Sequence, residues 1–442
     1  MLDGFDFFII GVANPLIKED LGANTWQIGL ISVAAILGAF VGATFLGPLG
    51  DKLGRQRLFR YDLVMFVVFS VACMFAWDIP SLVISRFLLG IAIGLDYPIA
   101  ASFLAEILPK KNRGRWLVSA FSLQAVGMLL GAIVGVLILV LLPSETSWRW
   151  MLGFGIIPAL GIIFLRRKVP ESPRWLAENG KESEAVEVTQ RLTGVPVFVS
   201  KKDQRDPARS PEGLKSLIQP ALFKRDLRRR TIFTAVPWFL MDIAVYGVDI
   251  FTPTLLAAMV IAGPNSSGIA ATKATAALDI FLVLGFIAAI FLIEKVGRIR
   301  LQLGGFVFMA VGLAILALAS ALTGGASDHL VLVFAGFAVF NFFMNAGPNA
   351  TTYALPAEVF PSEVRAAGHG FAAGMAKLGA ALGVFFFPIV LGIVDQWVLL
   401  AGLAGICIVG FVVTLVYQIE PAGKSLDEVS GRKAGGLAAR VD

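Results

Sequence analysis

The stretch Asp51-Lys-Leu-Gly-Arg-Gln-Arg57 follows the second long apolar segment of the chain, and Glu294-Lys-Val-Gly-Arg-Ile-Arg300 repeats it 243 residues later, after the eighth. A second pair of motifs repeats in the same way. Ala105-Glu-Ile-Leu-Pro-Lys-Lys-Asn-Arg113 follows the fourth segment, and Ala357-Glu-Val-Phe-Pro-Ser-Glu-Val-Arg365 follows the tenth. The two separations are nearly equal, which indicates that a unit of six segments is duplicated. Parallel six-helix repeats around a site at the membrane midplane are typical of transporters.

The composition of the chain is that of a membrane protein. Of its 442 residues, 57% are hydrophobic and 15% are charged, whereas a soluble domain has about 25% charged residues. One soluble core cannot hold this apolar excess, because cores stop growing near ~250–300 residues. Disorder, a collagen-like fibre and a disulfide scaffold are excluded as well. A protein that crosses the membrane many times is the class that fits.

Twelve apolar segments are long enough to cross a bilayer as helices, which takes about 20 residues each. They lie at residues 2–17, 26–49, 58–77, 81–107, 115–142, 148–166, 231–261, 270–293, 300–322, 329–355, 367–394 and 397–418. We therefore predict an all-α membrane protein of twelve transmembrane helices, in two pseudo-symmetric six-helix bundles at 1–166 and 231–418. A cytoplasmic central loop with short helices is expected at 167–230, and a cytoplasmic tail at 419–442. The first segment lacks a separate charged region and a small-residue cleavage site, so no cleaved signal peptide is expected.

Cationic residues gather on one side of the predicted membrane. The loops after the even-numbered segments carry most of them: Lys52, Arg55, Arg57, Arg60, Lys110, Lys111, Arg113, Arg115, Arg166, Arg167, Lys168, Lys295, Arg298 and Arg300. The positive-inside rule places these loops and both termini in the cytoplasm. The expected location of the protein is the plasma (cell inner) membrane. The net charge of +6 thus records orientation and predicts no nucleic-acid partner.

Nothing in the sequence predicts an enzyme, a cofactor or a metal site. Cys73 and Cys407 sit inside apolar segments, and the two histidines, His329 and His369, are far apart. No glycine-rich loop ending in Gly-Lys-Ser/Thr is present to bind a nucleotide, while several carboxylates lie in the membrane segments. A proton gradient is therefore the expected driving force, and a monomer in the lipid bilayer is the expected state.

Charged residues of the repeated motifs form candidate ion pairs at the cytoplasmic ends of the helices. Pairs that are made in one state and broken in another predict a gate for alternating access. The alternative is that they only fix topology, with about 0–1 kcal/mol for each exposed pair. The candidates are Asp51 with Arg55 or with a helix end of the other bundle, Glu106 with Arg113, Glu358 with Arg365, and Glu294 with Arg298 in the second copy of the loop motif.

Ionisable residues inside membrane segments are costly and are candidates for function. Arg86 is expected to face Asp6 or Asp3 across the first bundle, in a pair that protonation of the carboxylate would break. A purely structural buried pair is the alternative. The full set is Asp3, Asp6, Arg86, Asp96, Asp242, Asp249, Asp279 and Lys377.

Trp238, Asp242 and Tyr246 recur at intervals of four residues in the seventh segment, so they share one helical face. The indole and phenol groups donate hydrogen bonds, a carboxylate accepts them, and a carboxylic acid does both. Such a column suits a compact oxyanion that still carries protons, such as dihydrogen phosphate rather than sulfate. An aromatic belt with an isolated aspartate is the alternative.

The loop motifs resemble those of the major facilitator superfamily over nearly the whole chain. Arg86-x-x-x-Gly90 opens the fourth helix in the same pattern, and Pro170-Glu-Ser-Pro-Arg-Trp175 is similar to the motif that closes the first half of sugar porters. Glu420-Pro-Ala-Gly-Lys-Ser-Leu-Asp-Glu428 looks like its counterpart after the twelfth helix. The resemblance implies a secondary transporter and does not name the solute.

A narrower resemblance is to the phosphate:proton symporter family. It is carried by Leu95-Asp-Tyr-Pro-Ile99, by Gln124, by the seventh-helix column and by Ala346-Gly-Pro-Asn-Ala-Thr-Thr352. The resemblance implies that Tyr97, Gln124, Trp238, Asp242, Tyr246 and Asn349 bind phosphate. It also implies proton coupling by Asp96 and an acid of the first helix, Asp3 or Asp6, with Lys377 as an electrostatic partner.

Other transported solutes stay open on the sequence alone. The paired glutamines that sugar porters place in the seventh helix are replaced by Pro237-Trp238, which disfavours a sugar. A proton-coupled symporter of a small organic acid or another metabolite fits the same residues. A nutrient sensor that binds its solute without transporting it is a further alternative on the same fold.

Overall fold

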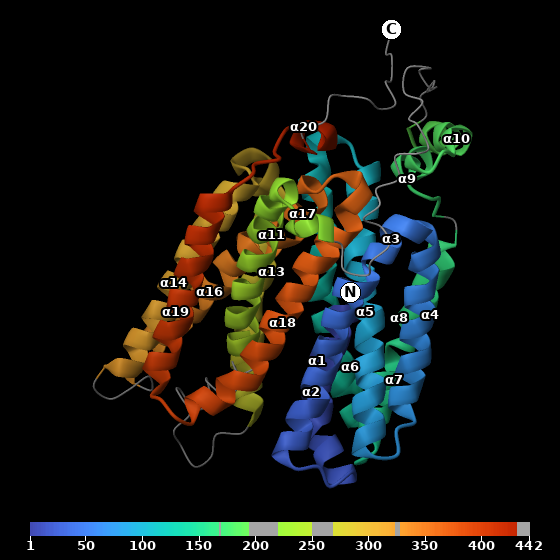
Figure 1. Cartoon of the computed structure of the whole chain (residues 1–442). Helices are drawn as coiled ribbons and strands as arrows, with labels where there is room; N and C mark the ends of the chain where they lie inside the picture. Colours follow the sequence, from blue (N-terminus) through green and yellow to red (C-terminus); the bar gives the residue numbers. More distant parts are fainter. Residues whose placement is uncertain (168, 194–219, 250–267, 323–327, 431–442) are drawn as a thin grey trace.

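The computed structural model describes residues 1–167, 169–193, 220–249, 268–322 and 328–430 (Figure 1). Within these ranges the chain forms helices and turns and contains no strand. Nine helical stretches of the described chain are long and apolar enough to cross a membrane. The other three predicted segments correspond to α1 (Leu2–Asp20), α4 (Arg55–Met74) and α13 (Gly268–Val296). The predicted all-α membrane fold is confirmed.

The first bundle comprises the helices up to residue 166. Helix α1 packs on α6, and α2 packs on α5. After α1 come α2 (Thr25–Val41), the π-helix η1 (Gly42–Leu46), α3 (Pro48–Leu53), α4, α5 (Ile79–Ile107), the 3-10 turn η2 (Lys110–Asn112), α6 (Arg113–Leu141), α7 (Ser147–Phe154) and α8 (Ile156–Arg166), and then the short helices α9 (Pro173–Glu178) and α10 (Glu182–Thr193).

The second bundle repeats the arrangement. Helix α11 packs on α18, and α14 packs on α16 and α19. The seventh segment, expected at 231–261, begins earlier, at Arg225, and residues 250–261 lie outside the described chain. The elements are η6 (Pro220–Phe223), α11 (Arg225–Asp249), α13, α14 (Arg298–Ala321), α16 (Leu330–Ala346), α17 (Pro348–Val359), η7 (Ser362–Val364), α18 (Arg365–Leu391), α19 (Gln396–Tyr417) and α20 (Leu426–Ser430).

Two membrane segments are divided where a proline interrupts the helical hydrogen bonds. The sixth breaks at Gly155 into α7 and α8, just before Pro158, which has no N–H to donate to the preceding turn. The tenth breaks at Gly347, and Pro348 becomes the first residue of α17, a position that tolerates proline. The second break places Asn349 in a first helical turn inside the membrane.

Glycines let α2 and α5 approach until their backbones touch. A Cβ atom added at Gly90 or Gly94 of α5 would overlap the carbonyl oxygen of Ala35 or Ala39 on α2. Small residues permit such close packing of helices in membranes, where van der Waals contact replaces the hydrophobic effect. The backbones of the two helices are therefore in direct contact at these glycines.

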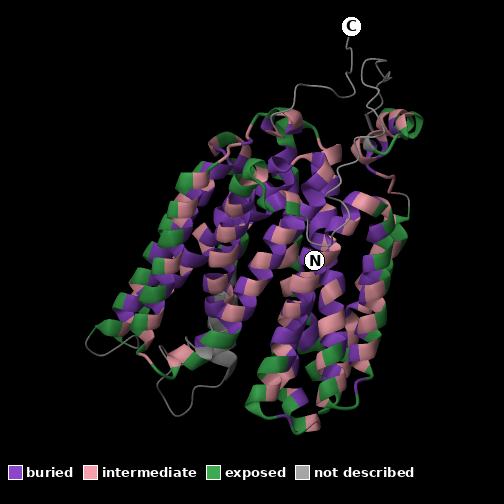
Figure 2. Ribbon diagram, viewed as in Figure 1, coloured by how far each residue is buried: buried purple, intermediate pink, exposed green. Residues whose placement is uncertain are grey.

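The outer faces of both bundles suit a lipid environment. Buried residues follow the surfaces where helices meet, and exposed residues cover the outside (Figure 2). Large apolar side chains such as Val140, Phe164 and Val331 are among the exposed ones. Lipid tails are as apolar as these side chains, so a bilayer covers them without cost.

Both copies of the loop motif lie at one end of the molecule, together with α9, α10 and α20 (Figure 1). We call it the motif end. There α18 of the second bundle packs on η1 and α3 of the first. The two bundles are therefore in contact at the motif end.

Candidate functional site

Lys377 lies in a buried polar cluster between the two bundles. Its Nζ donates to the Tyr246 hydroxyl at 2.9 Å and lies 3.8 Å from Asp242 Oδ2. The same Nζ lies 5.2 Å from the centre of the Tyr97 ring and 5.4 Å from that of Phe7. The Lys377 side chain on α18 therefore contacts residues of α11 in its own bundle and of α1 and α5 in the other.

The expected column on the seventh helix faces this cation. Asp242 and Tyr246 lie one turn apart on α11, and Asp242 Oδ2 accepts no hydrogen bond from the described residues. Trp238, one turn earlier, is buried and lies edge-on to Tyr353 at 6.3 Å and to His369 at 5.7 Å. This helix face therefore carries an indole, a carboxylate and a phenol, and Lys377 is the counterion of the carboxylate.

Residues of the first bundle reach the same cluster. The Tyr97 hydroxyl donates to Asp3 Oδ2 at 2.5 Å, which joins α5 to α1. Gln124 of α6 lies beside α1, because its backbone carbonyl faces Gly4. The structure thus brings Asp3, Tyr97 and Gln124 together around the start of α1.

Tyr353 of α17 belongs to this region, although the sequence analysis did not single it out. Its ring stacks on Phe121 of α6 with centroids 4.4 Å apart and lies edge-on to Tyr97 at 6.4 Å. Tyr353 therefore contacts both bundles beside Trp238. A signal was present in the sequence, because Tyr353 lies four residues after Asn349 and shares its helical face.

Asn349 itself follows the break between α16 and α17. Its Nδ2 donates to Asn345 Oδ1 at 2.8 Å, and its side chain is half-buried. The side chains of Asp249 and Asp279, two further expected ionisable groups, lie outside the described part of the chain.

Arg86 and Asp6 form a buried pair between α5 and α1. Two guanidinium nitrogens donate to the two carboxylate oxygens at 3.2 and 3.1 Å, and Nε donates to the Ile31 carbonyl at 3.2 Å. Of the two expected partners, Arg86 therefore binds Asp6, while Asp3 binds Tyr97. Loss of one member of a buried pair costs about 3–5 kcal/mol, because the other charge is left unpaired.

Asp96 pairs with Arg166 at the end of α8. Arg166 lies 2.9 Å from Asp96 Oδ1 and 3.4 Å from Asp62 Oδ2, and its guanidinium lies 4.4 Å over the Phe59 ring. In the sequence Arg166 stands out only as a loop cation, and Asp62 was not predicted as a site residue. The signal for Asp62 was its position inside the apolar segment 58–77.

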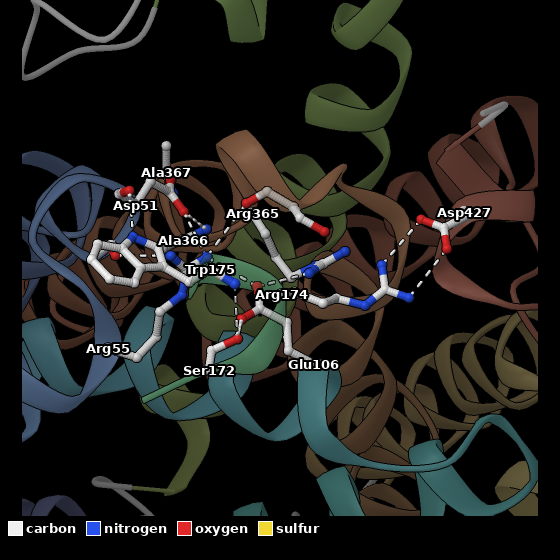
Figure 3. A network of polar contacts seen from close by, with 12 residues as sticks. Asp51, Arg55, Glu106, Ser172, Arg174, Trp175, Arg365, Ala366, Ala367 and Asp427 are labelled. Carbon is white, nitrogen blue, oxygen red and sulfur yellow. Dashed lines mark hydrogen bonds and ion pairs between the residues drawn. The ribbon is translucent and has the colours of Figure 1, made fainter. Parts of the chain in front are cut away.

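At the motif end, Asp51 binds the first turn of α18 (Figure 3). Its two carboxylate oxygens accept the backbone N–H groups of Ala366 at 3.2 Å and Ala367 at 2.9 Å, and one of them also accepts Arg55 at 3.1 Å. Unpaired N–H groups and the helix dipole favour a carboxylate at this position. Both expected partners bind Asp51 at once. Burial raises the pKa of Asp51 to about 7, although the Arg55 guanidinium acts in the opposite direction.

Glu106 connects the two bundles beside Asp51 (Figure 3). Its Oε1 accepts Arg55 and Arg365, each at 2.9 Å, and its Oε2 accepts the Ser172 hydroxyl at 2.5 Å. The expected pair of Glu106 with Arg113 is wrong. Arg113 and Arg365 begin α6 and α18, helices that pack on the other bundle, so Glu106 meets the arginine of the opposite bundle.

The second copy of the motifs is arranged in the same way. Arg298 lies 2.7 Å from Glu294 and 2.9 Å from Glu358, so Glu358 pairs with Arg298, and its expected pair with Arg365 stays a prediction. Glu294 accepts the backbone N–H of Arg115, in the first turn of α6, at 3.2 Å. Arg113 is within electrostatic range of Glu358.

In each bundle, one glutamate makes a contact within its own bundle at this end. Glu171 accepts the backbone N–H groups of Arg55 at 2.8 Å and Gln56 at 3.1 Å, at the start of α4. Glu420 does the same for α14, at 3.2 and 3.0 Å. The carboxylates satisfy N–H groups that a helix start leaves unpaired. The segment after each sixth helix therefore caps the third helix of its own bundle.

A further ion pair crosses between the bundles through α20. Arg174 of α9 donates to both carboxylate oxygens of Asp427, at 3.0 and 3.2 Å (Figure 3). No group of His, Cys, Asp and Glu suited to a metal occurs in the part of the chain that the structure describes. The polar chemistry found there is that of ion pairs and hydrogen bonds.

Comparisons with known proteins agree with this architecture. A family model described as sugar (and other) transporter matches residues 1–431. The putative metabolite transport protein YaaU of Escherichia coli (strain K12) is 31% identical over 434 residues, which cover 97% of this chain and 91% of that protein. The probable inorganic phosphate transporter 1-4 of Oryza sativa subsp. japonica is 31% identical over 488 residues, covering 97% and 89%.

One solved structure shows the same fold over nearly its whole length. The major facilitator superfamily proton:xylose symporter XylE, bound to 6-bromo-6-deoxy-D-glucose, superposes with a TM-score of 0.82 at 18% identity. The match covers 97% of this chain and 96% of that one.

Proposed function

Because the chain belongs to the sugar (and other) transporter family of the major facilitator superfamily, we propose that it imports inorganic phosphate together with protons by alternating access. The observation that carries this proposal is the buried Lys377 with Tyr246 at 2.9 Å and Asp242 at 3.8 Å. The members of the family are membrane transporters and not enzymes. The chain is accordingly a multi-pass membrane transporter, and the solute is the part proposed.

Phosphate suits the cluster because its chemistry is mixed. A lysine attracts an anion, Tyr246 and Trp238 offer hydrogen-bond donors, and Asp242 accepts a hydrogen bond. The Tyr97 hydroxyl donates to Asp3, so toward the solute its oxygen acts as an acceptor. Dihydrogen phosphate is an anion that both donates and accepts. Gln124 and Asn349 would add amide groups to the same site.

Proton coupling is assigned to the carboxylates of the first bundle. Protonation of Asp96 would weaken its hold on Arg166, which lies 2.9 Å away, and protonation of Asp6 would do the same for Arg86. Asp3 accepts the hydroxyl of Tyr97, a proposed solute ligand, so its charge is felt directly at the solute site. A proton taken up with the solute would thereby change contacts between helices.

The motif-end contacts are proposed as the cytoplasmic gate. Asp51, Glu106 and Arg365 hold the bundles together in the closed state, and inward opening requires that these contacts break. Their second copy at Glu294, Arg298, Glu358 and Arg113 would act likewise. We also propose that this end faces the cytoplasm with both termini, in an inner membrane, and that the monomer is the transporting unit.

One relative supports the choice of solute, since the Oryza sativa protein named above is described as a probable inorganic phosphate transporter. A second candidate is a proton-coupled symporter of another metabolite. The similarity to the metabolite transport protein of Escherichia coli and to the XylE fold favours it. Both candidates share the same cycle and differ only in the solute.

The test is solute uptake into proteoliposomes that contain the purified protein. Labelled phosphate should accumulate when the outside is made acidic, and a protonophore should abolish the accumulation. Unlabelled phosphate and arsenate should compete, whereas xylose, simple carboxylates and sulfate should not. Competition by xylose or a carboxylate without competition by phosphate would replace phosphate by the second candidate. Binding without uptake or counterflow would identify a sensor instead.

A further inference from the structure

Three asparagines follow one another at intervals of four residues across the break between α16 and α17: Asn341, Asn345 and Asn349. Asn341 and Asn345 are buried, and Asn349 is a proposed solute ligand. Asn349 shares its helical face with Tyr353, which contacts Trp238 and Tyr97. The row of amides therefore runs from the interior of the second bundle to the border of the solute site.

The hydrogen bonds of the row fix the direction of each amide. Asn345 Nδ2 donates to the main-chain carbonyl of Asn341 at 2.9 Å, and a carbonyl oxygen only accepts. The amide nitrogen of Asn345 must therefore face Asn341, which turns its Oδ1 to the other side. That oxygen accepts Asn349 Nδ2 at 2.8 Å, so Asn349 in turn must present its nitrogen to Asn345.

Asn345 is also held firmly in place. It is fully buried, and α13 packs directly on it at Gly285, where an added Cβ atom would lie 2.9 Å from the Asn345 Cβ. The two hydrogen bonds of this buried amide, at 2.9 and 2.8 Å, hold its orientation, because a flipped amide would place oxygen against oxygen and nitrogen against nitrogen. The direction of the Asn349 amide is thus imposed from the interior of the bundle.

We infer that Asn345 is a positioning residue that turns the carbonyl oxygen of Asn349 toward the solute and thereby favours a protonated oxyanion. This inference rests on the proposed function. One N–H of Asn349 is engaged by Asn345, and its Oδ1, which accepts no hydrogen bond from the described residues, can accept one from the P–O–H group of phosphate. Sulfate at neutral pH carries no proton and would place a lone pair against that oxygen. Asn345 therefore contributes to the choice of phosphate over sulfate without touching either.

The experiment measures phosphate uptake and its inhibition by sulfate in proteoliposomes with Asn345→Leu. Leucine has the branched shape of asparagine, with two bulkier methyl groups in place of the amide oxygen and nitrogen, and removes both hydrogen bonds. Loss of a polar partner of this kind has an effect on the order of ten-fold. We expect KM for phosphate to rise about ten-fold, kcat to change less than about two-fold, and sulfate to inhibit about ten-fold better. Asn341→Leu is the matched control, because it removes a buried amide one turn away but keeps the carbonyl that anchors Asn345.

A double variant separates positioning from a general loss of structure. In the Asn349→Ala background, Asn345→Leu should raise KM no further, because its effect passes through Asn349. Asn345→Ala, which removes the same oxygen, takes its place if the leucine variant is not recovered folded. Additive effects in the double variant, or an unchanged sulfate inhibition in the single one, would overturn the inference and leave phosphate transport intact. Absence of phosphate uptake by the unaltered protein would overturn the proposed function and this inference together.

Discussion

Lys377 is the residue whose loss affects the proposed solute site most directly. In Lys377→Met, the buried Asp242 has lost its cation and repels an incoming anion. Truncation of one member of a buried charge pair costs about 2–5 kcal/mol, so we expect Kd for phosphate to rise about 100-fold or more. Calorimetric titration of the purified protein measures it. Lys181→Met is the control, since Lys181 pairs with Glu184 on the exposed surface of α10, and equal affinity loss in both variants would contradict the assignment.

Asp96 should couple the proton rather than bind the solute. Asp96→Asn keeps the size of the side chain but cannot exchange a proton. We expect solute counterflow to persist and acid-driven accumulation to fall at least about ten-fold, because only net transport needs the coupled proton. Asp78→Asn is the control: this exposed aspartate caps α5, so it affects helix stability and not coupling. Normal acid-driven accumulation by Asp96→Asn would remove Asp96 from the coupling path.

Site residues that are marked by their spacing or charge within one segment could be predicted from the sequence. Those that are marked only by contacts between different helices could not. The period of four identified Trp238, Asp242 and Tyr246, and an isolated charge identified Lys377. Arg166 escaped notice because a cation at the end of a helix is normal there, and its pairing with Asp62 and Asp96 depends on how α4, α5 and α8 pack. The arginines of the motif end were paired within one bundle, whereas Glu106 binds Arg365 from the other.

At the scale of elements, the contact between α3 and α18 should respond to pH. In the closed motif end the pKa of Asp51 is raised to about 7, and exposure to water would return it toward about 3.9. Between these values the closed form binds more protons, so acidification favours closure and alkalinisation favours opening. We expect Ser362→Cys, buried in the closed form, to react faster with a maleimide at about pH 8 than at about pH 6.

The control for this pH response is Asp51→Asn in the same cysteine background. Asparagine does not titrate, so the reaction rate at Ser362→Cys should then follow only the intrinsic ionisation of a thiol. An identical excess of reactivity at high pH with and without Asp51 would contradict the assignment of the response to this carboxylate.

Gly370 sets how closely α18 can approach the first bundle. A Cβ atom there would overlap the Ala43 carbonyl in η1, so Gly370→Leu should wedge the motif end open. We expect loss of transport together with fast labelling of Ser362→Cys at every pH. Gly402→Leu on α19, where nothing lies within 4 Å of the added Cβ, should behave like the unaltered protein. Slow labelling of Ser362→Cys in the Gly370→Leu variant would show that α18 and η1 adjust to the larger side chain while the motif end stays closed.

The elements were predictable in number and type but less so in their interruptions. Apolar length alone identified each membrane segment, because a bilayer demands about 20 residues. The division at Gly347 was not predicted, since a Gly-Pro pair within an apolar run is compatible with a kink as well as a break. The early start of α11 at Arg225 reflects a polar first turn, which apolar length cannot detect.

At the scale of the whole molecule, the orientation in the membrane is open to a direct test. Thr146→Cys and Lys181→Cys place thiols at opposite ends, and the native Cys73 and Cys407 are buried. In intact cells an impermeant maleimide should label Thr146→Cys, and it should label Lys181→Cys only after the membrane is opened, as the positive-inside rule requires. The reverse pattern would place the motif end outside and exclude it as a cytoplasmic gate.

The duplication read from the motifs predicts two bundles, and the structure adds how they are joined. Each bundle caps its own third helix with Glu171 or Glu420 and offers its loop-motif acid, Asp51 or Glu294, to the first turn of a helix in the other bundle. For Asp51 the sequence left two partners open, Arg55 or a helix end of the other bundle, and the structure shows both. The corresponding contact of Glu294 was not predicted, because the sequence is equally compatible with contacts inside a bundle. The two contacts are alike in kind, because each acid accepts backbone N–H groups from the other bundle. Asp51 accepts two of them, and Glu294 accepts one.

The backbone contact between α2 and α5 also bears on how these two helices move during the transport cycle. Because no side chain separates them at Gly90 and Gly94, we expect the two helices to move together as a single rod. Trp26, exposed at the first turn of α2, is thus a native fluorophore at the tip of the rod whose other helix bears Tyr97. Its ring lies edge-on to that of Phe385 on α18, 5.4 Å away, so movement of these helices away from the second bundle would change the surroundings of this indole.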